Sequence, residues 1–185
     1  MADPVILETE RLILRPPLPD DALQIVDLLS VKDVAWNLGT VPYPYSIEDA
    51  QSWLALLPDL WAEDQGYIFA ITPDGERVMG MVSLMLRAAP VWELGYWRGK
   101  SVWLEGYMTE AAGGLMHWAQ SDMGLTQFAS GHFVDNHGSG RVLTKLGFRP
   151  VGEYDLFGLA RGAKQRSLRY VLGTDPDLAL RIVPH

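Results

Sequence analysis

The sequence predicts a mixed α/β (α+β) fold, with a mostly antiparallel central sheet of about seven strands flanked by about four helices. Three observations lead to this prediction. Three β-rich runs joined by short turns, from Tyr67 to Trp97, predict an antiparallel meander. A helix and then a strand at 126–134 follow, which predicts a crossover and hence a parallel pair. Two more β-rich runs, 151–156 and 167–172, extend the sheet.

Breakers and caps define the N-terminal elements. Leu12 and Leu14 alternate with polar or outward positions before two prolines, so ERLILRP predicts a short strand. Asp20 or Asp21 can cap a first helix that runs to about Ser30. In SIED a serine precedes an aspartate by three residues, and this capping-box spacing predicts a second helix over AQSWLALLPDLW.

Turn chemistry and hydrophobic pattern define the remaining elements. TPDGER contains a Pro-Asp-Gly turn between YIFAI and VMGMVSLML, which predicts a hairpin, and VWELGYW supplies the third strand of the meander. A third helix is predicted after Gly106, ending near Asp122, and a short fourth helix over SGRVLTKL.

Composition restricts the classes of function. The 185 residues suit one domain, 1–185, and 48% hydrophobic with 21% charged residues indicates a packed rather than disordered chain. The net charge of −8 argues against a nucleic-acid partner, because such proteins carry basic patches that displace phosphate counterions. An amine-bearing partner fits the acidic balance better, although that balance also simply favours solubility.

Residue types and segment lengths narrow the chemistry further. The chain has no cysteine, and its histidines lack metal-ligand spacing, so we expect neither thiolate chemistry nor a metal. No segment reaches about 18 consecutive apolar residues, and the N-terminus lacks a signal-peptide pattern. We therefore expect a cytoplasmic protein with no membrane partner.

Three stretches in this order resemble the GNAT superfamily of N-acetyltransferases: ETERLILRP (8–16), ELGYWRGKSVWLEGYMTEAA (93–112) and GHFVDNHGSGRVLTKLGFR (131–149). The resemblance covers roughly 8–172 and is to the ribosomal-protein N-terminal, RimJ/RimL-like type. It implies the GNAT fold, in which two neighbouring parallel strands splay apart. It also implies direct transfer of acetyl from acetyl-CoA to a primary amine, either a protein N-terminus or a small molecule.

The resemblance assigns the diphosphate of acetyl-CoA to the turn that opens the third helix. A first helical turn offers free N–H groups and a favourable dipole, and glycine at 106 permits an unusual backbone dihedral. Met108 and Leu104 depart from the family pattern, and Glu105 brings a carboxylate beside the anion. The alternative is a helix start merely packed by aromatic residues. The implied binding residues are Trp103, Leu104, Glu105, Gly106, Tyr107, Met108 and Thr109.

Met108 provides a structural test of this assignment. Its side chain is expected to point away from the diphosphate and leave its N–H free. A methionine side chain that filled this space would contradict the assignment.

The resemblance also implies residues for the pantetheine arm. Backbone groups of Tyr96, Trp97 and Arg98 are expected to pair with its amides as an added strand would. Asn136 and Ser139 match the family's Asn-x-x-Ser, in which the amide holds the arm and the hydroxyl approaches the sulfur. Capping of the last helix is the alternative for both residues.

Direct transfer requires a base for the ammonium and a proton donor for the leaving sulfur. By the resemblance, Glu93 is the first candidate for the base, and an ordinary outward strand carboxylate is its alternative. Asp135 is the second candidate, with a turn or cap role as its alternative. Leu143 stands where many members carry a tyrosine, which shifts the proton-donor role to Ser139.

The acceptor pocket is expected from segments 36–45, 63–67 and 154–165. Two other functions remain open: the same fold with a different acyl donor, and a GNAT-fold binding module whose degenerate turn has lost catalysis. A Rossmann site is rejected, because Gly106 lacks the companions of G-x-G-x-x-G and the later acidic residue. The apolar C-terminal strands are compatible with a homodimer.

Overall fold

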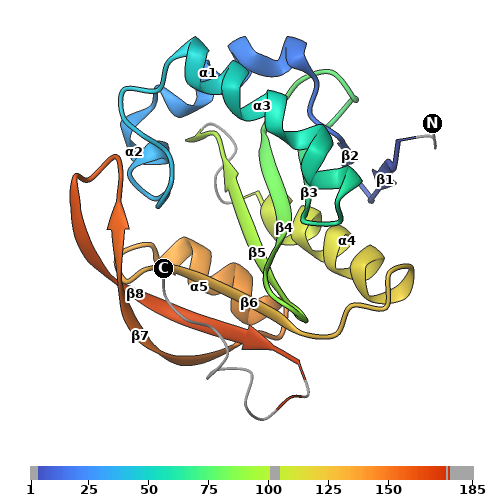
Figure 1. Cartoon of the computed structure of the whole chain (residues 1–185), viewed down its shortest axis with the longest axis vertical. Helices are drawn as coiled ribbons and strands as arrows, with labels where there is room; N and C mark the ends of the chain where they lie inside the picture. The colour runs from blue at the N-terminus through green and yellow to red at the C-terminus, as the bar shows by residue number, and fades with distance from the viewer. Residues whose placement is uncertain (1–3, 101–104, 174, 176–185) are drawn as a thin grey trace.

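One sheet organises the chain. The computed structural model describes residues 4–100, 105–173 and 175. Within them, eight strands form a sheet in the order β1-β2-β3-β4-β5-β6-β8-β7 (Figure 1). The strands are β1 (Leu7–Glu8), β2 (Ile13–Arg15), β3 (Gly66–Thr72), β4 (Gly80–Ala88), β5 (Val91–Arg98), β6 (Phe128–Phe133), β7 (Arg149–Gly158) and β8 (Ala163–Leu172).

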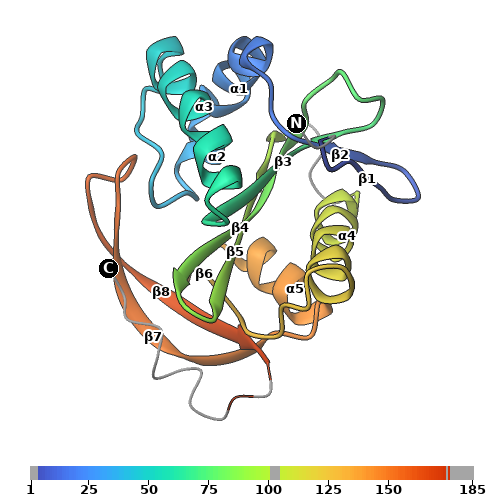
Figure 2. The ribbon, with the colours of Figure 1, turned by 45° about the vertical axis from the view of Figure 1, so that its right-hand side comes forward.

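Helices cover both faces of the sheet. The helices α1, α2 and α3 lie over one face, and α4 and α5 lie over the other (Figure 2). The described helices are α1 (Ala22–Leu29), α2 (Lys32–Ala35), α3 (Ile47–Ala62), α4 (Tyr107–Ser121) and α5 (His137–Lys145), with a 3-10 turn η1 (Pro19–Asp21) before α1.

The predicted fold class and the order of its elements are confirmed. The meander is antiparallel through β3, β4 and β5, and the crossover through α4 makes β5 and β6 parallel. Among the described residues the sheet has eight strands where about seven were predicted, and the α-helices number five where about four were predicted. The additional elements, β1 and α2, span two and four residues. Neither is long enough to produce a hydrophobic period.

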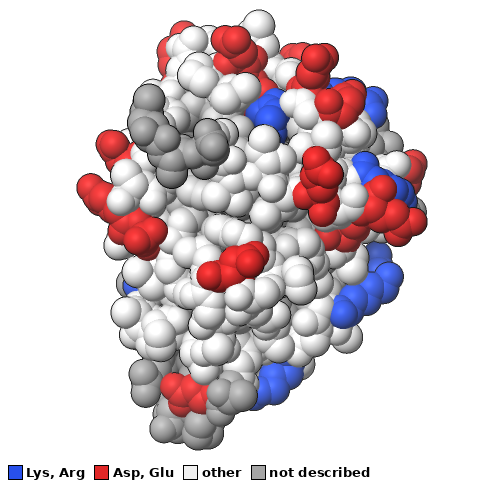
Figure 3. Space-filling view, turned by 90° about the vertical axis from the view of Figure 1, so that its right-hand side faces the viewer, with Lys and Arg blue, Asp and Glu red and all other residues white. Residues whose placement is uncertain are grey.

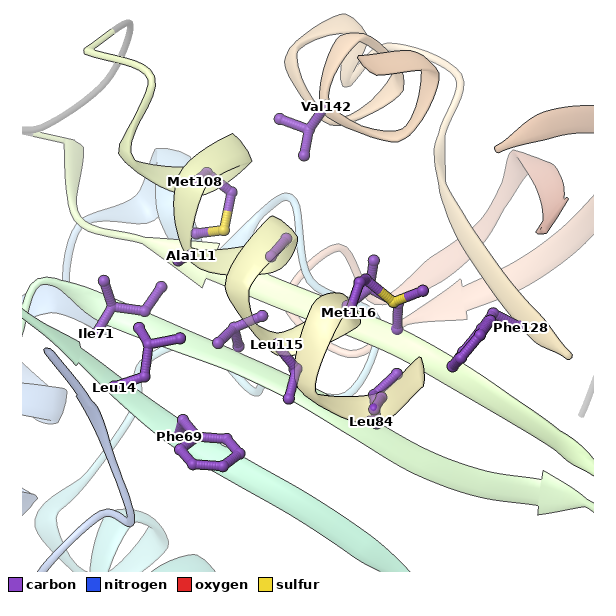
Figure 4. Close-up of a cluster of buried hydrophobic side chains, with 14 of the residues drawn as sticks. Leu14, Phe69, Ile71, Leu84, Met108, Ala111, Leu115, Met116, Phe128 and Val142 are labelled. Atoms are coloured by element: carbon purple, nitrogen blue, oxygen red, sulfur yellow. The ribbon is translucent and has the colours of Figure 1, made fainter. Parts of the chain in front are cut away.

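Two hydrophobic clusters hold the layers together. The larger fills the space between the sheet and α4 and α5, and Phe69, Leu84 and Leu115 are fully buried in it (Figure 4). Each side chain of this kind contributes about 1.5–3 kcal/mol on burial. The second cluster lies under α1 and α3. The sheet is thus anchored from both sides, which fixes the direction of every side chain on its central strands.

The parallel pair β5–β6 separates after two rungs. Trp92 pairs with Phe128 and Glu93 with Ala129, and these are the register pairs between the two strands. Just beyond, the hydroxyl of Ser130 donates to the carbonyl of Leu94 over 2.8 Å. A side chain therefore takes the place of a backbone rung, and the strands diverge toward their C-terminal ends. This splay leaves backbone groups of both strands available to a ligand.

Candidate active site

A single large cavity crosses the splay. Its volume is about 1510 Å³, above the roughly 300–1,000 Å³ of a site for one small molecule. It is lined by the C-terminal part of β5, most of β6, the starts of α4 and α5, and residues beneath α1 and α3. The cavity can accommodate two ligands that meet between the strands.

Alternation along β5 divides this cavity into two sides. Trp92, Leu94 and Tyr96 face the cluster beneath α4 and α5. Trp97 faces the cluster beneath α1 and α3, and the period of two puts Glu93 on the same side. Groups on successive β5 residues therefore reach the splay from opposite faces of the sheet.

The start of α4 is open at its N-terminus. Gly106 is the N-cap residue with φ +81°, a left-handed conformation in which a Cβ is strained, and no described side chain caps the helix. The N–H groups of the first turn have no acceptor within the helix. Gly106, Met108 and Thr109 line the cavity. Trp103 and Leu104, the other residues predicted here, lie outside the described residues.

Met108 is buried at the start of α4 and also lines the cavity. Its side chain is 2% exposed and packs in the larger cluster with Ala111 and Leu115 (Figure 4). The side chain thus lies among the core residues, and the helix start retains space on its cavity side. Because only the backbone faces an anion at such a turn, methionine at this position is compatible with anion binding.

Arg11 fixes the same turn from outside the cavity. Its Nη1 donates to the carbonyl of Glu105 over 3.2 Å, and its guanidinium lies 4.5 Å from the ring centroid of Tyr107. Glu105 and Tyr107 are absent from the cavity lining of the described residues. Tyr107 is partly buried and packs against the larger cluster.

Arg98 brings a cation to the cavity near this turn. Burial lowers the pKa of its guanidinium, while the nearby carboxylate of Glu105 acts in the opposite direction. Arg98 and Trp97 both line the cavity, as does Tyr96, so all three β5 residues predicted to hold the pantetheine arm border the splay.

Asn136 and Ser139 meet at the start of α5. Asn136 is the N-cap residue, and its Oδ1 accepts from the N–H of Ser139 over 3.2 Å. The capping role anticipated as an alternative for Asn136 is therefore present. The Oγ of Ser139 lies 2.8 Å from the hydroxyl of Tyr96, which also donates to the carbonyl of Ser139 over 3.0 Å. Both residues line the cavity.

The carboxylate of Glu93 is bound by two arginines. Its Oε2 accepts from Arg87 Nε over 2.5 Å, and its Oε1 accepts from Arg169 Nη1 over 2.8 Å. The guanidinium of Arg169 also lies 4.3 Å from the ring centroid of Tyr154. Glu93 borders the cavity beside the last rung of β5–β6. It is neither buried alone nor an unpaired surface carboxylate.

Asp135 is held in a bidentate pair. Both of its oxygens accept from Arg161, over 2.8 and 2.9 Å, and Arg161 also donates to the carbonyl of Trp36. The hydrogen bonds from Arg161 lower the pKa of the Asp135 carboxyl, against the effect of its partial burial. A carboxylate stabilised in this way is a weaker proton acceptor. The pair connects the β7–β8 turn to the loop between β6 and α5, and the bond to Trp36 connects the same turn to the end of α2.

Two of the three segments predicted for the acceptor pocket line the cavity. Segment 36–45 contributes residues from 37 to 45, and segment 154–165 contributes Tyr154, Leu156, Phe157 and Leu159. Residues 63–67 do not line this cavity, although Leu60 and Ile68 on either side of them do. Tyr67 is 3% exposed and stacks on Trp92 at a centroid distance of 5.2 Å within the core. The run YIFAI is apolar throughout, so it does not indicate that Tyr67 faces α4.

Sequence reasoning missed three groups at the site. The side chain of Tyr96 was expected to matter only through its backbone, and Arg87 and Arg169 were not singled out. A signal existed for Arg169, because it is a lone arginine within the apolar run SLRYVL. Buried charges are rarely left unpaired, so such a residue predicts a carboxylate partner.

The chain is similar to known proteins in both sequence and fold. Residues 11–149 match the model of the acetyltransferase (GNAT) domain family. The chain therefore belongs to the GNAT acetyltransferase family, and the protein is an acyltransferase. One curated relative is an uncharacterized N-acetyltransferase, YoaA, of Bacillus subtilis (strain 168), 31% identical over 150 residues, which are 80% of this chain and 84% of that protein.

Solved structures share the fold. RimL, a ribosomal alpha-N-protein acetyltransferase in complex with coenzyme A, is 20% identical, with a TM-score of 0.81 over 94% of this chain and 100% of that one. The self-immunity acetyltransferase MccE, in complex with acetyl-CoA and AMP, is 20% identical, with a TM-score of 0.76 over 89% of this chain and 93% of that one. At this identity the likeness shows the GNAT fold.

The described residues also bear on the presence of metal sites, membrane-spanning helices and charged surface patches. Among residues 4–100, 105–173 and 175, no three His, Asp or Glu side chains gather as metal ligands would. None of the described helices is both long and apolar enough to cross a membrane. On the face drawn in Figure 3, basic side chains stand in small separate groups among acidic ones.

Proposed function

We propose that the protein is an acetyl-CoA-dependent N-acetyltransferase of the RimJ/RimL-like type, which acetylates a primary amine on a protein N-terminus or a small molecule. One observation carries this proposal. The splayed edges of β5 and β6, the uncapped start of α4 and the start of α5 all border one cavity. Family membership and the bound CoA of two fold relatives support the donor.

The residues present fit the donor. The first-turn N–H groups from Gly106 to Thr109 suit a diphosphate, because they carry the positive end of the helix dipole. Backbone groups of Tyr96, Trp97 and Arg98 suit the amides of the pantetheine arm, as an added strand would use them. Acetyl-CoA supplies an activated thioester, and the remaining chemistry falls to side chains.

The leaving-group side of the reaction is assigned to Ser139. Its hydroxyl borders the cavity on the face that Tyr96 shares, and it is held at the start of α5 by the Asn136 cap. A hydroxyl in this place can give a proton to a departing thiolate and regain one from the amine side. Asn136 retains its N–H₂ donors for the pantetheine arm while its oxygen caps the helix.

The amine side is assigned to Glu93. Its position on the opposite face of β5 separates the base from Ser139, so deprotonation of the ammonium and protonation of the sulfur occur on different sides of the splay. The carbon–nitrogen bond forms as the carbon–sulfur bond breaks. Glu93 takes one proton from the ammonium, and a second nitrogen proton reaches the sulfur. Asp135 is the second candidate, and both carboxylates have arginine donors on both of their oxygens.

The test combines binding and turnover. Calorimetry with acetyl-CoA should show saturable binding, and a free-thiol assay with a panel of peptide N-termini, amino acids, polyamines and aminoglycosides should show acetyl transfer. No heat of binding at millimolar acetyl-CoA would contradict the proposal. Binding without thiol release from any amine would instead favour a binding module, and release only from longer acyl-CoAs would favour a different donor.

A further inference from the structure

The acceptor side of the cavity has a polar end and an apolar end on a single sheet face. Across β4 and β5, Met81 pairs with Trp97, Ser83 with Gly95, and Met85 with Glu93. These positions share one face by their period of two. We call this strip of β4 and β5 the floor of the acceptor side. Along β5 it carries the ring of Trp97, then no side chain at Gly95, and then the carboxylate of Glu93.

Glycine at 95 keeps the middle of this floor low. A Cβ there would lie 3.0 Å from the Oγ of Ser83, and Gly95 and Ser83 both line the cavity. With no side chain between Glu93 and Trp97, a ligand can lie along the strand and touch both ends. Residues of the second cluster also line the cavity on this side of the sheet, namely Leu38, Tyr45, Trp53, Leu57 and Leu60.

The polar end carries more positive than negative charge in its ion pairs. Arg87 and Arg169 share the single carboxylate of Glu93, so two guanidiniums bind one anion. The side chain of Arg169 is 13% exposed, whereas that of Arg87 is 47% exposed. All three line the cavity. A second carboxylate here would find guanidinium donors beside it, and an ammonium would find Glu93.

We propose that the acceptor is a free α-amino acid with a large apolar or aromatic side chain, an inference that rests on the proposed function. The ammonium binds Glu93, the carboxylate binds Arg87 and Arg169, and the side chain extends over Gly95 toward Trp97. The substrate carboxylate takes over guanidinium hydrogen bonds from Glu93, which frees a carboxylate oxygen for the ammonium. Arginine suits this exchange, since its planar fork binds two oxygens at once.

A peptide N-terminus satisfies this arrangement less well. It offers the ammonium and the apolar side chain, but a neutral amide carbonyl replaces the carboxylate. A simple aromatic amine has no oxygen that could accept hydrogen bonds from the arginines, and glycine has no side chain for the apolar end. Acceptor amines can therefore be compared that each lack either the carboxylate or the apolar side chain.

The experiment measures kcat/KM by thiol release for L-phenylalanine, L-phenylalaninamide, phenethylamine and glycine, at saturating acetyl-CoA. L-Phenylalanine should exceed each of the others by about tenfold or more, the loss expected for a missing charge-assisted hydrogen bond or a missing apolar side chain. Equal or better turnover of phenethylamine or phenylalaninamide would overturn the inference and leave the proposed function intact.

A variant assigns the preference to the arginines. Arg87→Gln should lower kcat/KM for L-phenylalanine by about tenfold more than it lowers kcat/KM for phenethylamine. The matched control is Arg166→Gln, because Arg166 is an exposed strand arginine paired with Glu153 and lies outside the cavity lining of the described residues. An equal loss for both acceptors in Arg87→Gln would contradict carboxylate recognition. Failure of acetyl-CoA to bind the wild type would instead refute the proposed function.

Discussion

The hydroxyl of Tyr96 on β5 lies 2.8 Å from the Oγ of Ser139 at the start of α5. Burial raises the pKa of the Tyr96 phenol, and the contact with Ser139 acts in the opposite direction. The phenol therefore stays protonated at neutral pH. Because the phenol donates its one hydrogen to the carbonyl of Ser139, its oxygen can accept from the Oγ of Ser139, which orients the serine hydroxyl. Tyr96 is thus a positioning residue for the group assigned to the leaving sulfur.

Ser139→Ala should lower kcat more than it lowers acetyl-CoA affinity, because a proton donor acts during the reaction rather than in binding. The expected loss is of the order of a hundredfold. Steady-state kinetics and calorimetry on the same preparation check the two quantities. Parallel losses in both would indicate that Ser139 positions the donor instead.

Tyr96→Phe should reduce kcat by roughly three- to tenfold, with KM for acetyl-CoA unchanged, since both hydrogen bonds between the phenol and Ser139 are removed. The decisive comparison is made in the Ser139→Ala background. There the same change should have almost no effect, because the residues act as a unit. A full additional loss in the double variant would mean that Tyr96 acts independently of Ser139.

Glu93→Gln should remove the acidic limb of the pH profile of kcat/KM, because glutamine cannot accept the proton of the ammonium. The control is Glu153→Gln, a strand carboxylate that is also paired with an arginine but is absent from the cavity lining of the described residues. It should retain the wild-type profile. If Glu93→Gln also retained it, the base would be Asp135 or water.

Gly106→Ala should weaken acetyl-CoA binding and also destabilise the fold by about 1–2 kcal/mol, the cost of a Cβ in the left-handed region. Gly124→Ala separates the two effects. Gly124 also has a positive φ, +66°, but nothing surrounds its absent side chain and it is absent from the cavity lining of the described residues. It should lose stability and bind acetyl-CoA normally. Equal affinities of the two variants would argue against anion binding at α4.

Glu110→Gln should destabilise the protein by about 1–3 kcal/mol, because charge-assisted hydrogen bonds are lost. Glu110 accepts from Thr9 Oγ1, Arg11 N and Arg11 Nε, each over 2.7 Å, and so ties the N-terminal segment to α4. Thermal unfolding of the variant beside the exposed-pair control Glu153→Gln checks this, and the control should change by less than about 1 kcal/mol. Equal losses would contradict it.

The same carboxyl predicts a pH dependence. Burial raises the pKa of Glu110, but hydrogen bonds from Thr9 and Arg11 outweigh it and bring the pKa below the ordinary 4.5. A lowered pKa in the folded state contributes stability above the ordinary pKa, and this is lost as pH falls through the lowered value. The Tm difference between wild type and Glu110→Gln should therefore shrink below about pH 4.5. A constant difference would contradict the assignment.

Much of the fold was predictable because its signals are local. Turn residues, capping boxes and alternating strands gave the meander, the crossover and the helix that starts after Gly106, and the confirmed parallel pair followed from chain order alone. The positions of Met108 and the Asn136 cap also follow from helical geometry. These properties depend on residues close in sequence.

The charged pairs were not predictable in the same way. Glu93 meets Arg169 across 76 positions, and Asp135 meets Arg161 in the β7–β8 turn, so each pairing depends on the register of strands that the sequence does not specify. Tyr96 likewise reaches Ser139 only because β5 and β6 diverge below α5. Long-range register and splay decided which side chains share the cavity.

Alternation along β5 has an evolutionary consequence. Odd positions from Glu93 to Trp97 face the side proposed for the amine, while Tyr96 and the start of α5 face the side proposed for the sulfur. A substitution at an odd position can change the acceptor without disturbing the handling of the thioester. Strand period thus separates the contacts proposed for the amine from those proposed for the thioester within five residues, so that one set can be changed by mutation without the other.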